Sequence, residues 1–127
     1  VKMTYGILIV SHVPEIAAGL PKLLKQVAAD VPITFAGGTD DGDIGTSMEK
    51  IGQAIEENAA DELLAFYDLG SARMNLDMAG EFAEKKVRVY DVALIEGSYV
   101  AASLLQAGVG LAELESQLAP LKIKGDN

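Results

Sequence analysis

The only histidine of the chain, His12, lies two residues beyond the end of the apolar run YGILIV of residues 5–10. A carboxylate, Asp68, lies at the end of a second apolar run, DELLAFYDL, in residues 61–69. An aspartate that accepts a hydrogen bond from one ring nitrogen of a histidine fixes the tautomer and directs the other nitrogen as a nucleophile. The two residues therefore predict nucleophilic chemistry at His12, provided that the fold brings them together.

Two loops rich in glycine and hydroxyl groups are candidates for binding an anion. Gly70 and Ser71 precede a segment with helical periodicity, and the segment AGGTDDGDIGTS of residues 36–47 contains Gly38 and Thr39. Free N–H groups at a helix N-terminus, the positive end of the helix dipole and a serine hydroxyl together suit a phosphoryl group. Phosphoryl transfer is the chemistry that these loops favour.

The same loops do not predict a bound nucleotide or a metal ion. The glycines match neither a P-loop nor a dinucleotide-binding fingerprint, and no lysine stands in the required place. The acidic residues Asp40, Asp41 and Asp43 fail the calcium-loop pattern, because Gly42 comes too early and no glutamate closes the loop. We expect a solvated acidic loop that caps a helix, no metal site and no cofactor held by this chain.

Short apolar runs alternate along the chain with longer segments of helical periodicity, which is typical of a parallel sheet covered by helices. We expect an α/β fold with an open, mainly parallel four-stranded sheet of order 2-1-3-4 and helices on both faces. In such a sheet His12 and Asp68 lie at the carboxyl ends of neighbouring strands and face each other. The expected strands are residues 5–10, 32–37, 61–69 and 85–94, and the expected helices are 14–29, 46–58, 71–84, 97–108 and 110–121.

Two helices carry local features with structural consequences. Pro21 lies inside the helix expected over 14–29, where it should kink the helix or displace its start. Met74 and Met78 are four residues apart in the helix expected over 71–84, which predicts a stripe that faces the core.

Composition limits the class of protein. A chain of 127 residues with 50% hydrophobic content predicts one domain spanning 1–127. The net charge of -9 argues against a nucleic-acid partner, and the absence of cysteine excludes disulfides and thiolate chemistry. No apolar run approaches the roughly 20 residues that span a bilayer. We expect a cytoplasmic protein with no nucleic-acid or membrane partner.

Four segments carry a resemblance to a known family: VSH after the first strand, AGGTDDGDIGTS, DLGSARMN after the third strand, and LIEGSYVAA near residue 100. Taken together they resemble the DhaM family, the phosphotransferase subunits of dihydroxyacetone kinases that depend on the phosphotransferase system (PTS). The length of the chain corresponds to the mannose-type IIA domain of these subunits. The resemblance implies the mannose-type IIA fold and a cytoplasmic homodimer.

The resemblance also implies a reaction within glycerol metabolism. A histidine accepts a phosphoryl group from phospho-HPr and passes it to ADP held by the DhaL subunit, which then serves dihydroxyacetone bound to DhaK. Any ADP, ATP and Mg²⁺ belong to DhaL. By the matched motifs, the phosphorylated nucleophile is His12, its orienting partner is Asp68, and the phosphoryl-binding residues are Gly38, Thr39, Ser71 and Ala72.

Three other interpretations stay open from the sequence. The chain could be a mannose-type IIA component of a sugar permease, with the same phosphohistidine and another acceptor. It could be a receiver-like signalling domain phosphorylated on Asp68, although Ser11 and His12 stand where that class has an acidic pair. It could also be a binding or oligomerisation module in which His12 has a structural role only.

Overall fold

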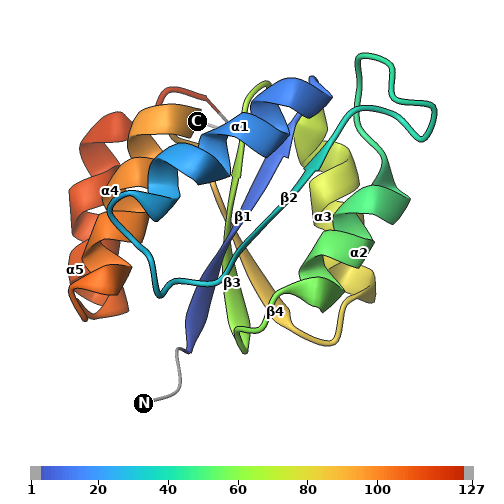
Figure 1. Cartoon of the computed structure of the whole chain (residues 1–127). Coiled ribbons are helices and arrows are strands. Elements are labelled where there is room, and N and C mark those ends of the chain that lie inside the picture. Colours follow the sequence, from blue (N-terminus) through green and yellow to red (C-terminus); the bar gives the residue numbers. More distant parts are fainter. Residues whose placement is uncertain (1–3, 125–127) are drawn as a thin grey trace.

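The computed structural model describes residues 4–124 and contains one four-stranded parallel sheet in the order β2-β1-β3-β4. Helices lie on both faces of the sheet (Figure 1). The predicted fold class and strand order are confirmed. The strands are β1 (Tyr5–Ser11), β2 (Ile33–Gly37), β3 (Glu62–Tyr67) and β4 (Lys86–Tyr90); the helices are α1 (Pro14–Lys25), α2 (Met48–Glu57), α3 (Ala72–Phe82), α4 (Leu94–Gln106) and α5 (Leu111–Leu118), followed by the 3-10 turn Ala119–Leu121.

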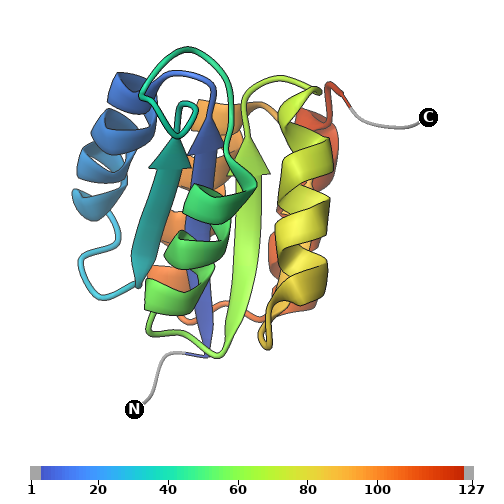
Figure 2. The same cartoon turned by 90° about the vertical axis from the view of Figure 1, so that its right-hand side faces the viewer.

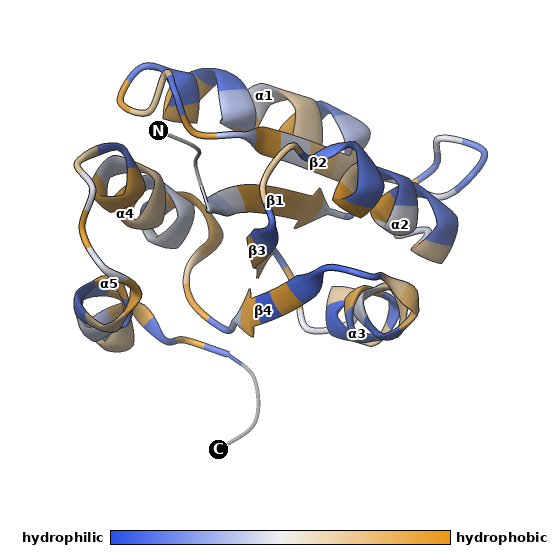
Figure 3. Ribbon diagram, turned by 90° about the horizontal axis from the view of Figure 1, so that it is seen from below, coloured by the Kyte–Doolittle hydropathy of each residue, from blue (hydrophilic) through white to orange (hydrophobic). Residues whose placement is uncertain are grey.

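The central strand β1 is buried on both faces, which explains why its sequence is continuously apolar. Ile7 and Ile9 pack into the core beneath α1, α4 and α5, whereas Leu8 and Val10 pack into a second core beneath α2 and α3. The edge strand β4 is less apolar, and Figure 3 shows it banded in hydrophilic and hydrophobic colours. The most apolar strand therefore lies in the middle of the sheet.

The register of the sheet brings three loops to one edge. Ser11 pairs with Gly37 of β2, and Val10 pairs with Tyr67 of β3. All four strands are parallel, and Figure 2 shows the arrowheads of β1, β2 and β3 pointing to the same edge. The residues that follow β1, β2 and β3 are consequently neighbours, as the predicted site requires.

The first helix begins where the sequence predicts and ends earlier. Pro14 occupies the first turn, where a missing N–H costs no helical hydrogen bond. The helix continues through Pro21 to Lys25 instead of reaching residue 29, and its start is not displaced.

The predicted fourth strand, residues 85–94, is too long at its C-terminal end. The strand ends at Tyr90, and α4 begins at Leu94 rather than at residue 97. The carbonyl of Asp91 accepts a hydrogen bond of 3.2 Å from the N–H of Ile123, so the backbone leaves the ladder at this point. Apolar residues on both sides of Asp91 concealed the junction between strand and helix.

The prediction that Met74 and Met78 face the core is wrong. Their side chains are 71% and 42% exposed, and α3 buries Ala72, Leu76 and Ala79 instead. At about 100° per residue, Leu76 points away from both methionines. The face of α3 with Ala72, Leu76 and Ala79 packs on the sheet, so the methionine stripe is left in solvent.

We expect Gly6→Ala to destabilise the fold, because a Cβ at Gly6 would lie 2.4 Å from Oδ1 of Asn58 and 2.9 Å from the carbonyl oxygen of Pro32. Overpacking of this kind lowers the free energy of unfolding by about 1–3 kcal/mol. The matched control is Gly52→Ala in α2, where no atom lies within 4 Å and a gain of about 0.5–1 kcal/mol is expected. Urea unfolding measures both, and an unchanged midpoint for Gly6→Ala would contradict the packing described here.

Candidate functional site

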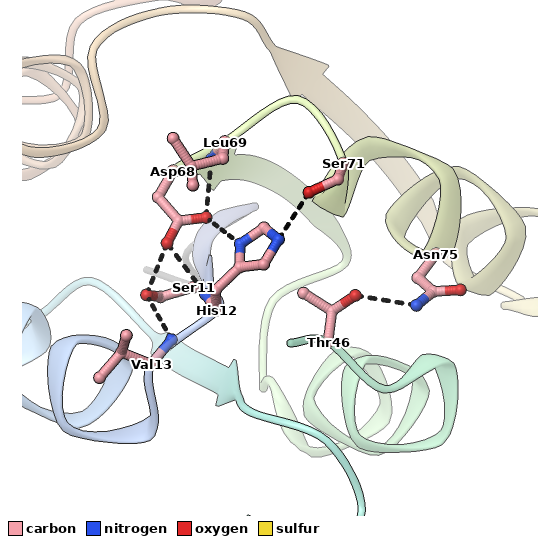
Figure 4. A network of polar contacts seen from close by, with 8 residues as sticks. All are labelled: Ser11, His12, Val13, Thr46, Asp68, Leu69, Ser71 and Asn75. Carbon is pink, nitrogen blue, oxygen red and sulfur yellow. Dashed lines mark hydrogen bonds and ion pairs between the residues drawn. The ribbon is translucent and has the colours of Figure 1, made fainter. Parts of the chain in front are cut away.

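His12 and Asp68 meet at the carboxyl edge of the sheet, as their positions after β1 and β3 predict. Nδ1 of His12 lies 2.8 Å from Oδ1 of Asp68. The other carboxylate oxygen accepts the backbone N–H of His12 at 2.9 Å and the hydroxyl of Ser11 at 2.8 Å. Figure 4 shows the carboxylate between the ring and the end of β1. Asp68 therefore holds both the side chain and the backbone of His12.

The carboxyl of Asp68 is held in its ionised form. Burial by itself raises the pKa of Asp68, but hydrogen bonds from the backbone and ring of His12, from Ser11 and from the N–H of Leu69 outweigh it. The N–H of Leu69 lies 2.7 Å from Oδ1. The pKa of Asp68 consequently falls below its ordinary value.

An ionised carboxylate only accepts hydrogen bonds, so Nδ1 of His12 carries the proton in this contact. In the neutral ring Nε2 then has a free lone pair, and it lies 2.7 Å from Oγ of Ser71, which donates to it. Ser71 is exposed and precedes the first residue of α3, while the His12 side chain remains 15% exposed. Nε2 is thus a directed nucleophile beside a helix N-terminus.

Ser11 belongs to the site, although the sequence analysis did not single it out. Its side chain is fully buried; the hydroxyl donates to Asp68 and accepts the N–H of Val13 at 3.1 Å. The hydroxyl thereby joins the end of β1 to the entry of α1. The feature that could have identified Ser11 from the sequence is its place as a polar residue at the last position of a buried strand.

The other predicted phosphoryl ligands lie in the neighbouring loops. The N–H groups of Gly38, Thr39 and Ala72 already donate to backbone carbonyls, at 3.3, 2.9 and 2.9 Å respectively. To bind a phosphoryl oxygen, each of these N–H groups must first give up its hydrogen bond to a backbone carbonyl. The phosphoryl-binding role of the three residues stays a prediction. Within residues 4–124, the N–H groups of Gly70 and Ser71 have no acceptor, so these two are the readiest backbone donors beside Nε2.

The loop between β2 and α2 closes the side of the site opposite Asp68. The N–H of Gly45 donates to the carbonyl of His12 at 2.9 Å. Next to it, the hydroxyl oxygen of Thr46 accepts a hydrogen bond of 2.8 Å from Nδ2 of Asn75 on α3. Both contacts were missed from the sequence, because they depend on how the loop of residues 38–47 folds back.

The acidic part of this loop contributes to the capping of α2. The hydroxyl of Ser47 donates to the carboxylate of Asp40, and its oxygen accepts the N–H of Lys50 at 3.1 Å as the N-cap of the helix. In the part of the chain that the structure describes, no group of three histidine, aspartate or glutamate side chains is placed to hold a metal ion.

The charged Lys124 is near enough to Asp68 for their charges to interact. The ammonium of Lys124 sits 4.5 Å from the centroid of the Tyr67 ring and donates to the carbonyl of Val92. Burial lowers the pKa of Lys124, while the charges of Asp68 and Asp91 act in the opposite direction. Burial and the hydrogen bond to Asp91 raise the pKa of Tyr67 to about 12, so its hydroxyl keeps its proton.

Comparison with known proteins agrees with this geometry. The profile of the EIIA-man family, described as PTS system fructose IIA component, matches residues 6–114. The chain belongs to the EIIA-man family. Curated relatives, one of them 52% identical, confirm the resemblance found in the sequence.

Two relatives match almost the full chain. One, from Lactococcus lactis subsp. lactis, is 52% identical over 96% of this chain and 99% of its own length, and is named PTS-dependent dihydroxyacetone kinase, phosphotransferase subunit DhaM. The other, from Listeria innocua serovar 6a, is 41% identical over 94% of this chain and 97% of its own length. It is named PEP-dependent dihydroxyacetone kinase 1, phosphoryl donor subunit DhaM.

Solved structures support the same fold. A crystal structure of a protein of unknown function is 30% identical, covers 98% of this chain and 100% of its own, and has a TM-score of 0.82. A sigma-54 interaction domain protein from Enterococcus faecalis, 12% identical with a TM-score of 0.67 over 93% of this chain and 90% of its own, shares the fold alone. Among residues 4–124, no helix is long and apolar enough to cross a bilayer.

The lowered pKa of Asp68 predicts a pH-dependent contribution to stability. The ionised carboxylate stabilises the fold above the pKa of the unfolded chain, about 3.9, and this contribution is lost as the pH falls through the lower pKa of the folded state. We expect Asp68→Asn to lower the free energy of unfolding at pH 7, and the difference from the unsubstituted protein to shrink below about pH 5.

Urea unfolding of both proteins between pH 7 and pH 2 measures this difference. Asp41→Asn in the exposed loop is the control for loss of a negative charge, because the Asp41 side chain is exposed. A difference for Asp68→Asn that stays constant or grows on acidification would show that the hydrogen bonds do not depend on its charge.

Proposed function

We propose that this chain is the phosphoryl-donor subunit of a PTS-dependent dihydroxyacetone kinase. In this proposal Nε2 of His12 accepts a phosphoryl group from phospho-HPr and passes it to ADP bound on a DhaL subunit. The observation that carries the proposal is the 2.8 Å contact of Nδ1 with Asp68, which leaves Nε2 directed at the N-terminus of α3. The names of the two DhaM relatives support this assignment over other PTS roles.

The transfer step needs no proton movement at His12. The lone pair of Nε2 forms a bond to phosphorus, and the bond between phosphorus and the nitrogen of the donor breaks with its electron pair going to the donor. Nδ1 keeps its proton and its hydrogen bond to Asp68, which stabilises the developing charge on the ring. Ser71 loses Nε2 as an acceptor and turns its hydroxyl to a phosphoryl oxygen. Positioning and electrostatics then supply the catalysis.

The partners in this proposal hold the remaining chemistry. DhaL brings ADP together with Mg²⁺, which neutralises charge on the nucleotide, and DhaK holds dihydroxyacetone. This chain supplies the histidine and its phosphoryl-binding loops and binds no cofactor of its own. The reaction takes place in the cytoplasm as part of glycerol metabolism.

The surface around Nε2 is suited to protein partners. Leu69, Ile44 and Met74 are 61%, 72% and 71% exposed, and each lies close in the chain to a residue that contacts His12 or Asp68. Exposed apolar side chains around a polar centre are typical of interaction sites. With a net charge of -9 on this chain, a partner with a positively charged rim is favoured.

A IIA component of a sugar permease is the second candidate, and the family description as a fructose IIA component favours it. Both candidates use the same phosphohistidine and differ in the acceptor. Transfer to DhaL with ADP, and not to a sugar-permease component, distinguishes them. The receiver-like interpretation loses support, because both oxygens of Asp68 accept hydrogen bonds from the protein.

We expect His12→Ala to abolish phosphorylation by phospho-HPr while leaving the fold intact, because the ring reaches the crevice rather than either core. Intact mass after incubation with phospho-HPr measures acceptance, and far-UV circular dichroism checks the fold. The product on the unsubstituted protein should be lost in acid and persist in alkali, as a phosphohistidine does. Full phosphorylation of His12→Ala would overturn the proposal.

Asp68→Asn is the companion variant in the same experiment. An amide can donate to Nδ1 and place the proton on Nε2, which blocks the nucleophile, so we expect a slow product that is still linked to histidine. An undiminished rate would show that Asp68 does not orient His12. Loss of all product in Asp68→Asn, together with full labelling of His12→Ala, would instead identify Asp68 as the acceptor.

The proposal includes a homodimer, which the family resemblance implies. A closed two-fold assembly is the commonest oligomer of soluble proteins, and the chain mass is 13.3 kDa. Light scattering at micromolar concentration should therefore give about twice the chain mass. A mass equal to that of one chain would contradict the dimer without affecting the assignment of His12.

A further inference from the structure

Thr46 and Asn75 lie at the phosphoryl site without an assigned role. Figure 4 shows both side chains on the side of the imidazole ring opposite Asp68. Each has a neighbour in the chain that contacts His12: Gly45, next to Thr46, donates to the carbonyl of His12, and Ser71, one helical turn before Asn75, contacts Nε2. The pair therefore forms the wall across from the carboxylate.

The hydrogen bond between the two residues leaves a donor available. Nδ2 of Asn75 donates to Oγ1 of Thr46 at 2.8 Å, so the threonine oxygen is the acceptor in this contact. The hydroxyl proton of Thr46 is not used by the amide and can point elsewhere. Thr46 is half-buried, which strengthens any hydrogen bond that it makes to an anion.

We propose that Thr46 is a phosphoryl-binding residue whose hydroxyl, held in place by Asn75, donates a hydrogen bond to an oxygen of the phosphoryl group on Nε2 of His12. The inference rests on the proposed function for the identity of the reaction. Asn75 is a positioning residue, because it acts through Thr46. In this arrangement the hydroxyls of Ser71 and Thr46 donate to the phosphoryl group from two sides.

The hydrogen bond from Thr46 acts during the transfer but adds no bond-making or proton-transfer step to it. The lone pair of Nε2 forms the bond to phosphorus, the bond to the donor nitrogen breaks towards the donor, and no proton leaves Thr46. The hydroxyl stabilises negative charge on an equatorial oxygen of the transferred group, which is where charge is spread in phosphoryl transfer.

The test compares rates of phosphorylation for Thr46→Val, Thr46→Ser and Asn75→Ala. Two donors are used in parallel, phospho-HPr and the small donor potassium phosphoramidate, with the product followed by intact mass. Loss of one hydrogen bond to a charged group predicts a rate about 10-fold to 100-fold lower for Thr46→Val. Thr46→Ser keeps the hydroxyl and should stay within about threefold of the unsubstituted rate.

The Asn75→Ala variant distinguishes a hydrogen bond from Thr46 to the phosphoryl group from a contact that only joins the loop to α3. It breaks the same hydrogen bond as Thr46→Val but leaves the hydroxyl in place, so its rate should fall less. Equal losses in the two variants would show that the pair only joins the loop to α3 and would overturn the proposal. A rate for Thr46→Val equal to that of the unsubstituted protein would overturn the proposal as well.

Thr34→Val is the matched control. The hydroxyl of Thr34 donates to the carbonyl of Ala54 at 2.8 Å, near the end of β2 that is remote from the site. The change of side chain is the same, so stability should fall while the rate stays constant. If Thr46→Val does not fold, Thr46→Ala takes its place with the same expected loss of rate.

The two donors separate this inference from the proposed function. If the unsubstituted protein is labelled on His12 by phosphoramidate but not by phospho-HPr, the proposed function fails, and the comparison of Thr46 variants still decides the inference. If neither donor labels His12, both fail.

Discussion

The carboxylate of Asp68 joins the ends of two neighbouring strands, because it accepts hydrogen bonds from Ser11, the last residue of β1, from His12, which follows it, and from Leu69 after β3. These donors keep it ionised, and its charge in turn decides which nitrogen of the ring carries a proton. A neutral group at this position could not hold the tautomer and the backbone together. The reactivity of Nε2 thus depends on the same contacts that close this edge of the sheet.

The crossover pattern of the sheet creates the space in which this contact lies. The helix after β1 covers one face, whereas the helices after β2 and β3 cover the other. The chain therefore diverges between β1 and β3, at the switch point where open α/β sheets bind ligands. His12 and Asp68 stand on the two sides of this divergence.

The sequence predicted what depends on strand order and missed what depends on side-chain direction in loops. His12 and Asp68 follow apolar runs, so a parallel sheet places them together without further information. The contact of Thr46 with Asn75 requires the path of a loop, which no periodicity encodes. Met78 was misplaced because helical spacing gives a stripe but not which of two apolar stripes faces the sheet.

The order of the strands in space has a consequence for folding. His12 and Asp68 are 56 residues apart, and β2 precedes β3 in the chain although both flank β1. A unit of β1, α1 and β2 can form as soon as those segments are present, but it contains only half of the catalytic pair. Pairing of β1 with β3 is long-range and parallel, which is slow relative to local structure formation. An intermediate folded only as far as β2 is consequently inert, and reactivity at His12 reports that the third strand has docked.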